Sequence, residues 1–162
     1  MTLVKPSNKP SNPNFSSGPC SKRPGWNIDV LKNAPTGRSH RSKECKAKLN
    51  EVIVKSKKVL GLPENYLLAI MTGSNTGALE AAMWSLLGSR GVDVLAWENF
   101  GKDWVIDVLD QLKIKDVNSY VTDYGILPDL KKVNFKNDVI FTWNGTTAGV
   151  RIPNGNWIPE NR

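Results

Sequence analysis

Residues 92–113 read VDVLAWENFGKDWVIDVLDQLK, and this stretch decides the fold. Its first part, 92–97, is a short apolar run that is typical of a buried strand. Its second part, 101–113, places apolar residues at helical spacing. A strand followed at once by a helix is half of a βαβ unit, in which the two strands run parallel. The stretch therefore predicts an α/β domain.

Similar blocks lie on both sides of this stretch. Toward the amino terminus we expect a strand over 66–72 (YLLAIMT) and a helix over 76–88, and toward the carboxyl terminus strands over 117–122 and 138–143. Short strands that alternate with helices of about a dozen residues indicate a mainly parallel sheet with flanking helices. The predicted fold class is therefore α/β.

The first third of the chain has a different character. Frequent prolines between Met1 and Ser39 predict an extended arm, because proline suits neither a helix interior nor a central strand. From Ser42 to Leu60 apolar residues recur at helical spacing, and Gly61 follows as a stop signal, which predicts an amphipathic helix. We place a Pro-rich arm at 1–41 and the α/β domain at 42–162.

Composition narrows the function classes. The 162 residues are 40% hydrophobic, which suits a globular protein and excludes a disordered one. No apolar run approaches the length of a membrane span and no secretory signal is visible, so we expect a cytoplasmic protein. Two cysteines and one histidine provide neither a disulfide framework nor a metal cluster, so we expect no metal.

The net charge of +7 is concentrated at one end. Residues 1–60 hold 13 Lys+Arg against 3 Asp+Glu, a net charge of +10, and residues 61–162 hold 9 against 12, a net charge of −3. A basic segment of this kind could attract a polyanion or a small phosphorylated substrate. It could equally be the solvated face of a lysine-rich helix, and these interpretations stay open here.

Three loops follow predicted strands, at the edge where open α/β sheets bind ligands. Residues 72–77 (TGSNTG) could cradle a phosphate with the free amides of a helix start, or they could form an ordinary helix cap. Phe100 could stack on a flat ring or merely pack. Residues 144–149 (NGTTAG) could hydrogen-bond a ligand or form a plain turn. Arg38 and Arg41 could clamp an anion or lie solvated.

Four motifs carry a family resemblance: FSSGP at 15–19, SHRSKE at 39–44, GSNTGA at 73–78 and WNGTTAG at 143–149. In order and spacing they resemble the phosphoserine aminotransferase family of the class V aminotransferases. The resemblance implies the amino-terminal part of a large domain of the aspartate-aminotransferase fold type and a cytoplasmic homodimer with no nucleic-acid or membrane partner. It also implies pyridoxal 5′-phosphate as cofactor, and amino transfer between glutamate and 3-phosphohydroxypyruvate in serine biosynthesis.

The resemblance also implies cofactor-binding residues by position. Ser74, Asn75 and Thr76 match the residues that hold the cofactor phosphate. Phe100 matches an aromatic residue that stacks on the pyridine ring, where family members often carry tryptophan. Thr146 matches a threonine that reaches the ring hydroxyl. All five residues are present in this sequence.

Substrate-binding residues are implied at one further motif. His40 and Arg41 match residues that bind the phosphate or carboxylate of the substrate, commonly across a dimer interface. The basic charge of the first third then has a purpose, because O-phosphoserine, 3-phosphohydroxypyruvate, glutamate and 2-oxoglutarate are all anions.

The resemblance implies that two essential parts lie beyond residue 162: the lysine that carries the cofactor and the aspartate that pairs with its ring nitrogen. No lysine in this sequence sits in a matching motif, so we assign no catalytic residue and expect the chain to be inactive alone. In the implied fold, strand 66–72 pairs with later strands, so we expect unpaired sheet edges, bare apolar faces and a tendency to aggregate.

Two alternatives stay open at this stage. Another class V pyridoxal-phosphate enzyme, such as an alanine–glyoxylate aminotransferase or a cysteine desulfurase, would share the glycine loop and the aromatic residue, but the motifs at 15–19 and 39–44 disfavour it. A basic α/β module that binds nucleotides or nucleic acid would use the positive segment. This alternative is weakened because the sequence contains no known nucleic-acid-binding motif.

Overall fold

The computed structural model describes residues 7–8, 11 and 22–160. Within it the chain forms two compact units, residues 1–68 and 69–162, which are described separately below. The division between these units lies well past residue 41, where we placed the end of the Pro-rich arm, because the long helix α1 (Lys43–Leu60) belongs to the first unit. That an arm ends and a domain begins at 41/42 stays a prediction. The motif at 15–19 and Cys20 lie outside the described residues.

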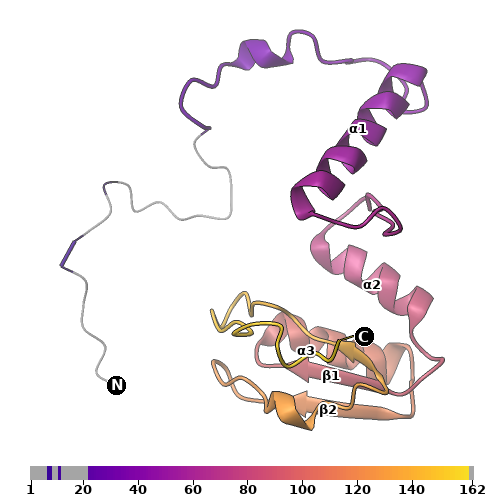
Figure 1. Cartoon of the computed structure of the whole chain (residues 1–162), viewed down its shortest axis with the longest axis vertical. Coiled ribbons are helices and arrows are strands. Elements are labelled where there is room, and N and C mark those ends of the chain that lie inside the picture. The colour runs from indigo at the N-terminus through magenta and orange to yellow at the C-terminus, as the bar shows by residue number, and fades with distance from the viewer. Residues whose placement is uncertain (1–6, 9–10, 12–21, 161–162) are drawn as a thin grey trace. The chain divides into compact units, whose positions relative to one another are not determined.

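The amino-terminal unit contains a short 3₁₀ helix, η1 (Ile28–Leu31), and a long helix, α1 (Lys43–Leu60). The expected amphipathic helix is thus confirmed (Figure 1). The Ser42 hydroxyl accepts a hydrogen bond from the amide of Cys45, and Gly61 ends the helix at φ 64°, in the left-handed region that favours glycine. None of its residues is buried, and its apolar face is open within this unit.

The carboxyl-terminal unit is built on three parallel strands, β1 (Val92–Ala96), β2 (Val117–Val121) and β3 (Asp138–Ile140), in the order β2-β1-β3. Val94 on the central strand is aligned with Ser119 of β2 and Ile140 of β3. The predicted α/β class and parallel sheet are confirmed. The third strand is shorter than the predicted 138–143, because the chain leaves the ladder before Phe141.

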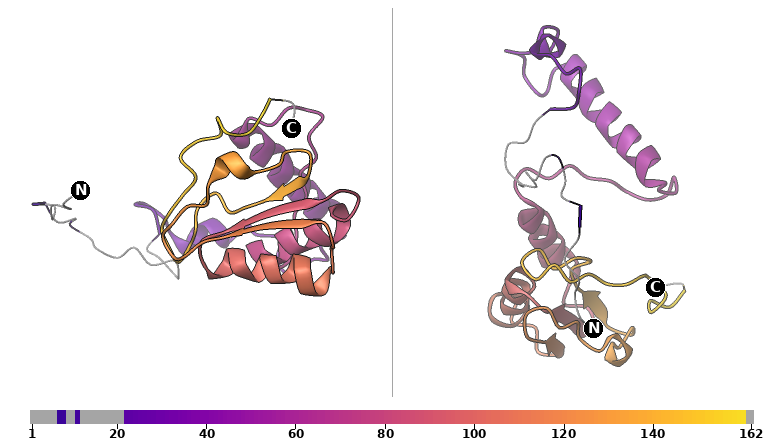
Figure 2. Two further views of the ribbon diagram at one scale, coloured as in Figure 1. Left: turned by 90° about the horizontal axis from the view of Figure 1, so that it is seen from below. Right: turned by 90° about the vertical axis from the view of Figure 1, so that its left-hand side faces the viewer.

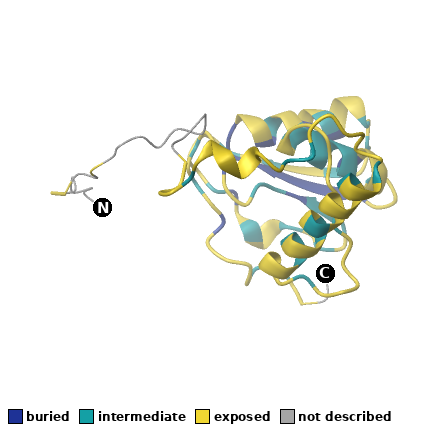
Figure 3. Cartoon of the chain, turned by 90° about the horizontal axis from the view of Figure 1, so that it is seen from above, coloured by how far each residue is buried: buried dark blue, intermediate teal, exposed yellow. Residues whose placement is uncertain are grey.

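Two helices cover one face of this sheet. Helix α2 (Asn75–Leu86) and helix α3 (Asn99–Ile106) confirm the expected helical segments, although α3 continues as a single π-helical turn, η2 (Asp107–Gln111), rather than as regular α-helix. Met83 of α2 and Val105 of α3 pack on Val92 and Val94 of the central strand. All five residues of β1 are buried, as the dark ribbon in Figure 3 shows.

The opposite face carries a second apolar cluster. Leu95, Trp97 and Ile152 are fully buried there, and the segment after β3 supplies much of the cover. Trp157 packs against Phe141, with ring centroids 5.1 Å apart. The left view of Figure 2 shows this carboxyl-terminal segment and α3 on opposite faces of the sheet. The expectation of bare apolar faces is therefore wrong for this face, because the chain's own last described residues cover it.

A buried carboxylate on this second face of the sheet accepts hydrogen bonds from several neighbouring segments. Asp93 of β1 is fully buried and accepts hydrogen bonds from the side-chain amides of Asn118 (2.9 Å) and Asn137 (2.7 Å), from the Asn134 amide (2.7 Å) and from the Tyr120 hydroxyl (3.0 Å). Burial alone would raise the pKa of the Asp93 carboxyl, but these hydrogen bonds outweigh it and hold the pKa below its ordinary value. Burial and the neighbouring carboxylate raise the pKa of Tyr120.

The predicted strand over 66–72 is wrong. This segment is irregular and pairs with no strand among the described residues. Leu67 is 99% exposed, and Tyr66, Ile70 and Met71 are also exposed. An apolar run forms a strand only where a partner strand satisfies its backbone amides and carbonyls, and neither outer strand of the β2-β1-β3 sheet provides one.

Among the described residues, no helix combines the length and the apolar character that crossing a bilayer demands.

Candidate functional site

The first wall of the candidate site is the start of α2. Ser74 caps this helix: its hydroxyl accepts from the amide of Gly77 at 3.1 Å and its carbonyl accepts from Ala78 at 3.1 Å. The amides of Asn75 and Thr76 make no hydrogen bond to other described residues. Two free donors at the positive end of a helix dipole form a binding position for an anion.

The second wall is the start of α3. Here the carboxylate of Glu98 caps the helix and accepts from the amide of Gly101 at 2.7 Å. Phe100, in the first turn, is 40% exposed rather than packed into the core. An aromatic ring left open beside a cavity is suited to stacking on a flat ligand.

The third wall is the loop after β3. Reciprocal backbone bonds close it into a narrow turn: the Gly145 amide donates to Val150 at 2.8 Å and the Ile152 amide donates to Trp143 at 2.8 Å. The indole nitrogen of buried Trp97 donates to the Val150 carbonyl at 2.9 Å. These bonds hold the exposed side chain of Thr146 at the tip of the loop.

The three walls border one open cavity of about 590 Å³, within the range of roughly 300–1,000 Å³ that small-ligand sites occupy. All five residues predicted to bind the cofactor line it, and they come from three loops that are far apart in the sequence. The lining residues are Ser74, Asn75, Thr76, Leu79, Phe100, Trp104, Phe141, Thr142, Trp143, Asn144 and Thr146.

Sequence reasoning missed the apolar part of this cavity. Leu79, Trp104 and Trp143 line it beside Phe100, so that the site combines hydrogen-bond donors on one side with aromatic surface on the other. Trp104 occupies the helical position four residues after Phe100, and this spacing was a signal that could have revealed it.

Two lining residues carry polar atoms that lack partners. The hydroxyl of Thr142 and the indole nitrogen of Trp104 are buried and make no hydrogen bond among the described residues. No charged side chain is among the described residues that line the cavity. An anion held there would therefore depend on neutral donors and the helix dipole, in apolar surroundings that strengthen both.

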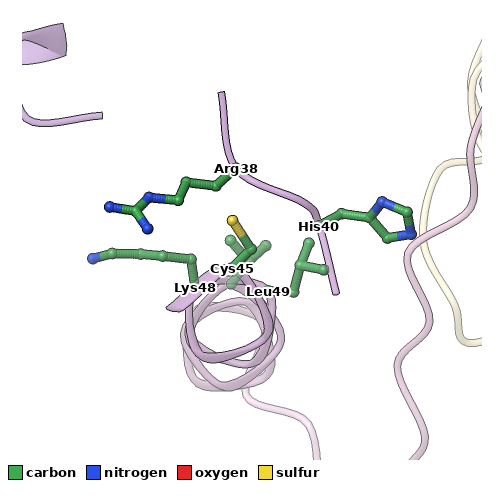
Figure 4. A pocket seen from close by; sticks show the side chains of 6 residues that line it. Arg38, His40, Cys45, Lys48 and Leu49 are labelled. Carbon is green, nitrogen blue, oxygen red and sulfur yellow. The ribbon is translucent and has the colours of Figure 1, made fainter. Parts of the chain in front are cut away.

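The predicted substrate residues belong to the amino-terminal unit. His40 lines a cavity of about 330 Å³ there, together with Arg38, Cys45, Lys48, Leu49 and Val52. Figure 4 shows the Arg38 and Lys48 side chains extending the same way beside the Cys45 sulfur, while the His40 ring points elsewhere. Arg41 is exposed and does not line this cavity; its amide donates to the Ser39 hydroxyl at 3.2 Å.

The role of His40 and Arg41 as a substrate clamp thus stays a prediction. Cationic Arg38 and Lys48, which border the cavity, give it the positive character that was expected of this region. Arg38 also approaches Glu44, with Nε and Oε2 3.9 Å apart. Within the described ranges, no three His, Cys, Asp or Glu side chains are grouped so that they could hold a metal ion.

Comparison with known proteins gives two close relatives. The chain is 60% identical over 159 residues to the phosphoserine aminotransferase of Methanosarcina barkeri (strain Fusaro / DSM 804), and 57% identical over 159 residues to that of Methanosarcina mazei. Each match covers 98% of this chain and 43% of the relative, so the chain spans less than half the length of the curated relatives. No family model and no solved structure matches it. The predicted resemblance is confirmed.

Proposed function

We propose that this chain is the amino-terminal part of a pyridoxal-phosphate-dependent phosphoserine aminotransferase. The observation that carries the proposal is the single cavity lined by the starts of α2 and α3 and the tip of the loop after β3. The names of two relatives, each matched over nearly the whole of this chain, support the same assignment. The reaction proposed for the complete enzyme is transfer of an amino group between glutamate and 3-phosphohydroxypyruvate.

Pyridoxal phosphate fits the residues present. Its phosphate needs hydrogen-bond donors at a positive helix end, and the free amides of Asn75 and Thr76 offer them. Its flat ring needs an open aromatic surface, which Phe100 offers, and its ring hydroxyl needs a polar partner, which Thr146 offers. The unpartnered hydroxyl of Thr142 in the cavity wall is a further group that a polar ligand could satisfy.

The residues of this chain would bind and orient the cofactor. When bound, pyridoxal phosphate supplies the electron sink that withdraws charge from the α-carbon of the amino acid. The α2 amides would fix one end of the molecule, and Phe100 and Thr146 would fix the plane and rotation of its ring. Trp104 and Trp143 would exclude water from the same space.

The catalytic lysine of the proposed enzyme would lie in the part of the relatives that this chain does not span. Among the described residues that line the cavity, none is a lysine. Proton transfer and covalent attachment of the cofactor both require such a group, so activity depends on joining this chain to the remainder. We further propose that the complete enzyme is a homodimer, in which His40 and Arg41 bind the anionic groups of the substrates.

A chimaera tests this function. The matching stretch of the Methanosarcina barkeri relative is replaced by this chain, and transfer of an amino group from O-phosphoserine to 2-oxoglutarate is measured beside the unaltered relative. We expect activity within about tenfold of the relative's, a difference of roughly 1.4 kcal/mol in the activation barrier. A folded chimaera that retains pyridoxal phosphate but fails to use O-phosphoserine would overturn the proposed substrate.

A variant of the chimaera tests the clamp. Arg41→Ala should raise KM for the phosphorylated substrate far more than KM for glutamate, because a guanidinium group pairs more strongly with a phosphate than with a single carboxylate. Equal effects on both substrates would contradict the assignment of Arg41.

A further inference from the structure

Behind the walls of the cavity lies a buried carboxylate whose role the five predicted residues do not explain. Glu98, at the start of α3, is fully buried, yet no arginine, lysine or histidine lies within salt-bridge distance of it in the described part of the chain. Burying a carboxylate without a cation costs free energy, which hydrogen bonds offset only in part. The carboxylate therefore contributes its hydrogen bonds, which an apolar side chain could not make.

Those hydrogen bonds join two separate walls. Oε1 accepts from the Gly101 amide at 2.7 Å, in the helix turn that carries Phe100, and Oε2 accepts from the Thr147 hydroxyl at 3.0 Å, next to Thr146. The bonded residues Glu98 and Thr147 are 49 positions apart in the sequence. One buried group is thus bonded to both surfaces that face the predicted ring position.

The packing around Glu98 leaves little freedom. A Cβ atom on Gly101 would lie 3.4 Å from Glu98 Oε1, and one on Gly145 would lie 2.9 Å from Glu98 Cγ. The loop of Gly145 approaches the Glu98 side chain so closely that only glycine fits there without a shift. At Gly101 the contact with Oε1 is an ordinary one, and the tighter neighbour is Ala96, whose Cβ would lie 3.2 Å away. A movement of either wall would therefore break a hydrogen bond or create a clash.

A second hydrogen-bonded link runs over the surface. Asn99 Oδ1 lies 2.7 Å from Thr147 Oγ1 and accepts from the Tyr124 hydroxyl, which itself lies 3.4 Å from Thr147 Oγ1. A threonine hydroxyl has one proton, which it can donate to only one of these oxygens at a time. With the Asn99 amide turned so that its nitrogen faces Thr147, that nitrogen would donate to Thr147 Oγ1 and leave the hydroxyl proton for Glu98 Oε2.

We propose that Glu98 is a positioning residue that sets the separation and orientation of Phe100 and Thr146, and so the fit of the cofactor ring between them. This inference rests on the proposed function. Glu98 does not line the cavity and acts through the two walls. The phosphate position does not depend on it, because Ser74 and the α2 backbone organise that position within their own helix turn.

The test compares two probes on four variants of this chain. Pyridoxamine 5′-phosphate reports on ring and phosphate together and, unlike pyridoxal phosphate, forms no covalent bond with surface lysines. Inorganic phosphate reports on the α2 position alone. The variants are Glu98→Ala, Glu98→Gln, Thr147→Val and, as a control, Asp129→Ala, which removes a helix cap elsewhere in the same unit. Dissociation constants come from equilibrium dialysis.

Loss of the hydrogen bonds should weaken the binding of pyridoxamine phosphate only. Glu98→Ala should weaken pyridoxamine phosphate binding by about tenfold, as expected for the loss of roughly one to two hydrogen bonds, and leave phosphate binding within about twofold. Glu98→Gln should restore binding to within about threefold, since its amide can accept from Gly101 and donate to Thr147. Thr147→Val should resemble Glu98→Ala, and Asp129→Ala should resemble the unaltered chain.

Three results would overturn the proposal: equal loss of both probes in Glu98→Ala, no loss of either, or failure of Glu98→Gln to restore binding. If the unaltered chain binds neither probe, the cofactor site itself fails, and amide hydrogen exchange then decides the role of Glu98. Glu98→Ala should raise exchange at 99–104 and at 144–150 together, whereas Glu98→Gln should not. Unchanged exchange at either wall would exclude a positioning role.

Discussion

Gly145 marks the closest approach in the candidate site, and replacing it by alanine should disturb both the fold and the cavity. A Cβ atom at this position would lie 2.5 Å from Trp97 Nε1 and 2.9 Å from Glu98 Cγ. Trp97 and Glu98 are fully buried, so neither side chain can swing into solvent. The loop itself must move away from the sheet to accept the methyl group.

The expected cost follows from these contacts. Overpacking of a close-packed site costs about 1–3 kcal/mol. Movement of the loop also strains the 2.9 Å hydrogen bond from Trp97 to Val150, whose net contribution to stability is about 1 kcal/mol. We therefore expect Gly145→Ala to lower the free energy of unfolding of the carboxyl-terminal unit by about 2–4 kcal/mol.

A second glycine provides the control. A Cβ atom on Gly155, in the same carboxyl-terminal segment, would meet no heavy atom within 4 Å. Gly155→Ala should change stability by no more than about 0.5 kcal/mol. Urea unfolding, followed by tryptophan fluorescence at low protein concentration, measures both variants against the unaltered chain. Equal unfolding midpoints for Gly145→Ala and Gly155→Ala would refute the close packing of the loop against Trp97.

Three further predictions concern other parts of the chain. Asp93→Asn should destabilise the carboxyl-terminal unit most at neutral pH. Because the folded-state pKa of Asp93 is lowered, its contribution to stability is present above the unfolded pKa of about 3.9 and is lost as pH falls through the folded pKa. The urea midpoints of the variant and the unaltered chain should therefore converge in acid, and a gap that does not change with pH would contradict this. Ser74→Ala and Ser42→Ala each remove a helix cap and should each cost about 1 kcal/mol of stability. Only Ser74→Ala should weaken the binding of inorganic phosphate. Equal phosphate binding in the two variants would mean that residues 72–77 form an ordinary helix cap and no phosphate site. The exposed apolar side chains of α1 and of 66–71 should make the isolated chain self-associate as its concentration rises, which light scattering measures. Leu67→Lys should reduce this self-association. A monomer with one sharp thermal transition would contradict the prediction.

Local signals in the sequence were sufficient for the helices and for the position of the site. Ser42 and Gly61 mark the ends of α1 because capping depends on neighbours within a few residues. The meeting of Phe100 and Thr146 was predictable because the loops after the parallel strands β1 and β3 lie at one edge of the sheet. The α2 start lines the same cavity although no strand precedes it in the described part of the chain.

Features that depend on distant partners could not be predicted in the same way. The run at 66–72 has the composition of a strand, but pairing decides whether a strand forms, and the described residues offer it no partner. The bond between Glu98 and Thr147 and the bonds of Asp93 to Asn134 and Asn137 span 41 to 49 positions. Nothing in the local sequence indicates which distant donor a buried carboxylate will meet.

Amide hydrogen exchange of this chain, with and without pyridoxamine 5′-phosphate, tests the central claim most directly. If three loops form one cofactor site, added ligand should slow exchange at 74–78, at 99–104 and at 143–147 together, and should leave helix α1 unchanged. Slower exchange confined to the lysine-rich residues of α1, or to one of the three loops, would contradict the account.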